Sequence, residues 1–167
     1  GDLDVFMNRW TVGAPIGVLS WYKNLGAGVF APPVNLHQGN PDRASDFDLR
    51  DLDDDGDLDI VYCTVNSNDL IVRRYDAGSF GAPEVWGSLA NGPRYLRFIE
   101  LPGISWWWLI AQGASGEAHP YYLSGNTFVE YQVNGNGADL TGVINIEVGN
   151  LTGYLGNIVV QTTDRLW

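Results

Sequence analysis

Six aspartates fall within the nine residues 51–59, and their spacing constrains the fold more than any other feature. Loop positions 1, 3, 5 and 9 can offer carboxylate oxygens to one centre, and position 7 can add its backbone carbonyl. Position 6 is a glycine, Gly56, where a chain that wraps around an ion needs an unhindered turn. Such charge density needs a hard cation, and the spacing suits Ca²⁺. The predicted calcium ligands are Asp51, Asp53, Asp55, the carbonyl of Asp57, and Asp59.

The flanks of this loop decide which kind of calcium site it can be. An EF-hand needs a helix on each side and a bidentate Glu at position 12, which here is Tyr62. Downstream, residues 60–65 are a β-branched and aromatic run typical of a strand. Upstream, residues 43–49 lack helical periodicity. We therefore predict a strand–loop–strand hairpin.

The composition indicates an all-β protein whose acidity is local. Twenty-one Gly, eight Pro and seven Trp among 167 residues favour many turns and few helices. The net charge is −11, but residues 46–59 alone hold eight Asp and one Arg. Nucleic acid is not expected as a partner, because no basic stripe exists to meet phosphates. Asp54 is expected to point away from the ion, and Asp46 and Asp48 are interpreted as turn or strand-edge residues.

Several features bear on the compartment. The single cysteine, Cys63, excludes an internal disulfide framework and is interpreted as a small buried apolar residue. No apolar run approaches 18 residues, so no membrane span is predicted. Calcium modules with dissociation constants of roughly 10⁻⁴–10⁻³ M stay loaded outside the cell, which favours an extracellular or cell-surface location. Asn150 begins a glycosylation sequon, although one match can arise by chance.

The acidic loop belongs to an internal repeat. Residues 1–7 (GDLDVFM) match residues 56–62 (GDLDIVY), and residues 28–33 (GVFAPP) match residues 78–83 (GSFGAP). These matches define one repeat region over residues 1–167, with units of about fifty residues. The expected units are approximately 1–42, 43–92, 93–140 and 141–167, of which the first and last are incomplete.

The later units keep the strands but lose the acids. Residues 105–111 (SWWWLIA) replace the strand after the loop, and residues 101–104 hold no carboxylate. The fourth unit has strand-like runs at 144–148 and 157–160, and the gap between them offers no acid. We therefore expect no calcium in these two units.

Repeats of 40–50 residues with several short strands are typical of β-propeller blades. The predicted fold class is thus all-β, as a run of propeller blades. About 3.3 units are too few to close a ring of four to eight blades. We expect either a partial propeller from a longer polypeptide or an assembly of several copies.

The motifs resemble those of the FG-GAP/VCBS repeat family, in which an Asp-x-Asp-x-Asp-Gly-x-x-Asp loop precedes an apolar strand. Residues 21–30 (WYKNLGAGVF) and 80–83 (FGAP) resemble its later segment. The resemblance is strong over residues 1–86 and weak over 87–167. It implies a seven- or eight-bladed extracellular propeller with Ca²⁺ in the first hairpin of a blade, and it adds Asp4 to the predicted ligands. It implies no activity.

The preferred functional hypothesis is a non-catalytic calcium-stabilised scaffold for adhesion, binding or assembly. Its expected partners are protein or glycan ligands at the cell surface or matrix, or further copies of the chain joined through open sheet edges into an oligomer or filament. The alternative is a lectin that uses exposed Trp and Tyr. A propeller-type lyase or hydrolase ranks lowest, because His37 and His119 lie in no catalytic or metal motif and the glutamates are scattered singly. Residues 106–108, three successive tryptophans, are interpreted as part of a buried inner strand.

Overall fold

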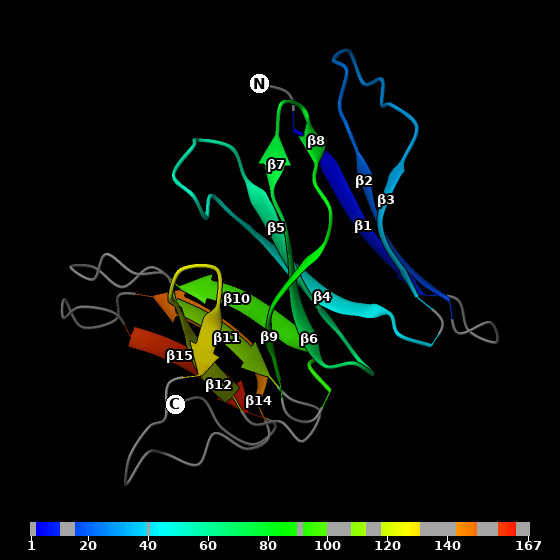
Figure 1. Cartoon of the computed structure of the whole chain (residues 1–167). Helices are drawn as coiled ribbons and strands as arrows, with labels where there is room; N and C mark the ends of the chain where they lie inside the picture. The colour runs from blue at the N-terminus through cyan, green and yellow to red at the C-terminus, as the bar shows by residue number, and fades with distance from the viewer. Residues whose placement is uncertain are drawn as a thin grey trace, which may run out of the picture.

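The computed structural model describes residues 3–10, 16–39, 41–89, 92–99, 108–112, 118–130, 143–149 and 157–162. These residues form fifteen strands and contain no helix, which confirms the predicted all-β class (Figure 1). In particular, this part of the chain offers no helix that could cross a membrane. Some residues that figure in the predictions lie outside the described part of the chain, namely Trp106, Trp107, residues 101–104 and Asn150.

The strands form successive antiparallel meanders along the chain. The first sheet has the order β1-β2-β3, and the second has the order β4-β5-β6-β9. The third has the order β10-β11-β12-β13, and β14 pairs with β15. The bounds of the first two sheets are β1 (Val5–Trp10), β2 (Gly17–Tyr22), β3 (Val34–Gly39), β4 (Ala44–Arg50), β5 (Asp59–Thr64), β6 (Asp69–Arg73) and β9 (Glu84–Ser88). The others are β10 (Tyr95–Ile99), β11 (Trp108–Gln112), β12 (Ala118–Leu123), β13 (Phe128–Glu130), β14 (Val143–Gly149) and β15 (Asn157–Thr162).

Strand β5, in the middle of the second sheet, is buried on both faces. All six residues of β5 are buried, and successive side chains of a strand point to opposite faces. Ile60 and Tyr62 join a core with Leu19 and Trp21 of the first sheet. Val61 and Cys63 join a second core that includes residues of the third sheet. The continuous apolar run after the acidic loop therefore serves two interfaces at once.

A short hairpin between β6 and β9 of the second sheet packs against the first sheet. It consists of β7 (Tyr75–Asp76) and β8 (Ser79–Phe80), and Figure 1 shows it beside the start of β1. The Phe80 ring packs edge-on against Trp21 of the first sheet, with 5.2 Å between ring centroids. Phe128 of the third sheet likewise contacts Trp86 of the second sheet at 5.9 Å. Phe80 and Phe128 thus each anchor a sheet to the one before it.

The first strands of the second and third sheets, β4 and β10, are joined by side chains. An Asp46 carboxylate oxygen accepts the N–H of Leu96 at 2.9 Å, and one of Asp48 accepts the N–H of Phe98 at 2.8 Å. Both partners advance by two residues in the same direction, so the two strands run parallel. Burial raises the pKa of Asp46, and its bonds to the Leu96 N–H and to Arg97 offset this only in part.

Candidate metal centre

Residues 51–58 connect β4 to β5 as the turn of an antiparallel hairpin, in which Arg50 pairs with Asp59. This confirms the predicted strand–loop–strand arrangement. Gly56 has a φ of 94°, a conformation that favours glycine and that the sequence predicted at this position. Asp54 has a φ of 60° and is exposed, which its short polar side chain tolerates.

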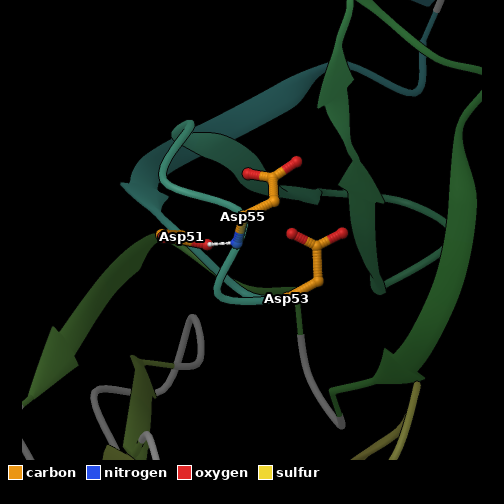
Figure 2. Close-up of side chains that lie close together, drawn as sticks. All are labelled: Asp51, Asp53 and Asp55. Carbon is orange, nitrogen blue, oxygen red and sulfur yellow. Dashed lines mark hydrogen bonds between the residues drawn. The ribbon is translucent and has the colours of Figure 1, made fainter.

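The loop brings together the carboxylates of Asp51, Asp53 and Asp55. One oxygen from each lies within 4.8 Å of the others, and Figure 2 shows the three side chains grouped on the loop. The Asp51 carboxylate accepts the N–H groups of Asp55 at 3.2 Å and of Gly56 at 2.9 Å. An oxygen of Asp55 accepts the N–H of Asp57 at 2.8 Å. These local hydrogen bonds fold the backbone around its own side chains and bring the three carboxylates together. We call these three residues the Asp triad.

Arg74, which follows β6, supplies positive charge beside the triad. Its Nη1 lies 3.0 Å from an oxygen of Asp53, with about a third of each side chain exposed. Its other terminal nitrogen donates to Asn126 Oδ1 at 3.0 Å, and the guanidinium lies 5.3 Å from the Trp86 ring centroid. The triad carries three formal negative charges, so one guanidinium neutralises it only in part. No local pattern indicates this neighbour, because Arg74 lies 21 residues from Asp53 along the chain.

Asp59 lies next to the triad but has other contacts. It is completely buried, and its two oxygens accept the N–H groups of Leu52 at 3.2 Å and of Tyr75 at 2.8 Å. Burial raises the pKa of Asp59, the two N–H bonds oppose that rise, and the charges of Asp53 and Asp55 add to it. The Asp59 carboxylate therefore links the loop to the start of β7 through these two hydrogen bonds. It is not one of the three grouped carboxylates.

Asp4 has the corresponding role in the first sheet. Its oxygens accept the Trp21 indole N–H at 2.9 Å and the Asn24 main-chain N–H at 2.7 Å. The structure does not bring Asp4 into the triad. It does place Asp4 and Asp57 on the lining of one cavity of about 380 Å³ between the first two sheets, so the acidic segments of both repeats lie at the same end of the molecule.

The donor set of the triad consists of hard carboxylate oxygens, which suit Ca²⁺, Mg²⁺ or Mn²⁺ better than a thiophilic metal. Among the described residues neither histidine joins it. His37 contacts the carbonyl of Asp42 at 2.8 Å, and His119 Nδ1 lies 2.7 Å from a Glu130 oxygen.

Comparisons of the chain with protein-family models, with curated proteins and with solved structures found no match in any of the three.

Proposed function

We propose that this chain is a calcium-stabilised β-propeller scaffold of the cell exterior that mediates adhesion, binding or assembly without catalysis. The observation that carries the proposal is the Asp triad, which the hairpin turn converges at the spacing that a calcium loop requires. Asp51, Asp53 and Asp55 would hold the ion, and Asp57 could add its carbonyl. When bound, the ion would neutralise the loop and cross-link the ends of β4 and β5.

Three features of the fold support blades over an ordinary β-sandwich. The first strands of the three sheets after the first, β4, β10 and β14, begin at residues 44, 95 and 143, which is a recurrence of about fifty residues. The second sheet packs on both its neighbours, as a blade within a ring does. Strands β4 and β10 lie side by side and parallel, which is the arrangement of inner strands around a propeller axis.

The energetic consequence of calcium can be estimated. A ligand that binds only the folded state stabilises it by RT ln(1 + [L]/Kd), which is about 1.4–2.7 kcal/mol at ten to a hundred times Kd. Extracellular modules bind with Kd of roughly 10⁻⁴–10⁻³ M, so 10 mM calcium reaches that range. For a chain of this size the melting temperature should rise by about 3–10 °C.

Thermal melting of the chain in 10 mM calcium and in EGTA tests the proposal, with 10 mM magnesium as a second cation. Asp55→Asn removes one triad carboxylate and should abolish the rise in melting temperature that calcium causes. Asp54→Asn is the matched control, because it removes the same charge from the same loop outside the triad and keeps a residue that tolerates the positive φ. An identical melting curve in calcium and EGTA, or equal effects of the two variants, would refute the proposal.

A further inference from the structure

A second polar cavity lies at the end of the second sheet opposite the Asp triad. The triad follows the end of β4, whereas this cavity of about 740 Å³ is lined by residues at the start of β4 and at its neighbours. The neighbours are the end of β1, the residues after β5 and the start of β10. The lining residues that the argument uses are Asn8, Trp10, Arg43, Asn66, Arg94 and Tyr95.

The cavity is positively charged in a protein of net charge −11. Arg43 and Arg94 have no carboxylate at ion-pair distance among the described residues, whereas Arg74 and Arg97 each pair with an aspartate. Asp42, the carboxylate next to Arg43 in the chain, instead accepts the main-chain N–H groups of the turn after β5. The two guanidinium groups are thus available to an anion from outside.

Arg43 is held in place by packing. A Cβ on Gly17 would lie 2.2 Å from the Arg43 Cβ, so only glycine allows β2 to approach this closely. Gly17 pairs with Trp10 across the first sheet, and the Arg43 guanidinium lies 4.4 Å from the centroid of a Trp10 ring. The stem and the head of Arg43 therefore each have a fixed neighbour, which reduces the entropy lost when the guanidinium binds a ligand.

Two aromatic side chains remain exposed at the same cavity. Trp10 is 55% exposed and Tyr95 is 45% exposed. Alternate residues of β1 share one face, and on that face Phe6 contacts Phe47 while Asn8 donates to carbonyls of the second sheet. Trp10 continues this series to the cavity rim, where much of its surface stays uncovered. Aromatic surface beside amides and guanidinium groups is suited to a ligand with both apolar and polar faces.

We propose that this cavity binds an acidic sugar, meaning a saccharide ring that bears a carboxylate or a sulfate. Arg43 and Arg94 pair with the anionic group, since the guanidinium fork matches the oxygens of such anions. Trp10 and Tyr95 contact the C–H faces of the ring, and Asn66 hydrogen-bonds a hydroxyl. The volume lies within the range of about 300–1,000 Å³ that is usual for small-ligand sites. The proposal rests on none of the triad residues.

Isothermal titration of the full chain with methyl β-glucuronide, glucose 6-sulfate, neutral methyl β-glucoside and a Glu-rich tetrapeptide tests this inference. We expect at least one acidic sugar to bind tenfold or more tightly than the neutral one, and the choice between them identifies the anionic group. Equal binding of neutral and acidic sugars, no binding of any sugar, or binding of the peptide alone would overturn the proposal.

Variants locate the site. Arg43→Gln and Arg94→Gln should each weaken binding of the acidic sugar at least tenfold, while Arg9→Gln, which removes the same charge one residue from Trp10 on the opposite face of β1, should not. Arg94 is exposed, so its variant reports on the ligand even if Arg43→Gln unfolds. Binding that is unaffected by Arg94→Gln would place the ligand elsewhere. The titrations are run in calcium and in EGTA, and the calcium shift in melting temperature is measured in parallel, so that either proposal can fail alone.

Discussion

Replacing Asp59 by alanine removes the acceptor of two main-chain hydrogen bonds, those from the N–H groups of Leu52 and Tyr75. Because Asp59 is 0% exposed, water cannot readily replace the lost oxygens. A buried N–H group left without a partner costs about 1–3 kcal/mol, so the loss of two acceptors in Asp59→Ala should lower the free energy of unfolding by about 2–6 kcal/mol. Asp59→Asn keeps one acceptor oxygen and should cost roughly half as much.

This loss does not depend on calcium, and that separates Asp59 from the triad. Asp55 is exposed, and its expected contribution comes from the bound ion. Asp55→Asn should therefore reduce stability only when calcium is present, by about 1.4–2.7 kcal/mol at ten to a hundred times Kd. In EGTA the two variants should differ clearly, with Asp59→Ala destabilised and Asp55→Asn close to the parent chain.

Urea unfolding followed by tryptophan fluorescence, in 10 mM calcium and in EGTA, measures both effects. The comparison requires an unchanged m-value, since a change in m would indicate an altered denatured state. If Asp59→Ala cost less than about 1 kcal/mol in EGTA, its carboxylate would not be a structural acceptor and the reasoning from the two bonds would be wrong.

Three further predictions concern other charged or ionisable groups. Arg74→Gln removes a positive charge 3.0 Å from an Asp53 oxygen, so calcium titrations should show affinity rising about two- to tenfold, less at high salt; unchanged affinity would contradict this. Burial raises the pKa of Cys63 to about 12, so DTNB at pH 8 should label the thiol only as fast as the chain unfolds, and immediate labelling would be inconsistent with its position. Burial favours a higher pKa for Asp42, but hydrogen bonds from two main-chain N–H groups outweigh it and lower the pKa below 3.8. Asp42 therefore stabilises the folded state above pH 3.8, and this stabilisation is lost as the pH falls through the folded-state pKa. Asp42→Ala should cost on the order of 1 kcal/mol at pH 7 and progressively less below pH 3.8, and urea unfolding that showed a pH-independent cost would argue against this assignment.

The features predicted correctly from the sequence are those encoded over short distances. The hairpin around residues 51–58 and the glycine turn at Gly56 follow from residue types within a few positions of one another. The division of the chain into units of about fifty residues stays a prediction. The closed propeller and the bound calcium stay predictions.

Contacts between sheets could not be predicted, because the local pattern does not specify which segment lies opposite. Asp59 and Asp4 have the spacing of ligands, yet their oxygens accept main-chain and indole N–H groups from distant strands. The repeated phenylalanine is a second example. Phe30 is 42% exposed, whereas Phe80, at the matching position, is half-buried against Trp21 of the first sheet. Equal motifs thus acquire unequal environments.

The paired carboxylates of β4 also determine where one sheet stops and the next begins. Apolar residues at Asp46 and Asp48 would leave the outward N–H groups of Leu96 and Phe98 free to seek main-chain carbonyls, and β4 and β10 could then merge into one continuous ladder. An aspartate side chain satisfies those donors while keeping the two backbones farther apart than hydrogen-bonded strands. Asp46 and Asp48 thus keep β4 and β10 as the edges of two separate sheets that lie side by side.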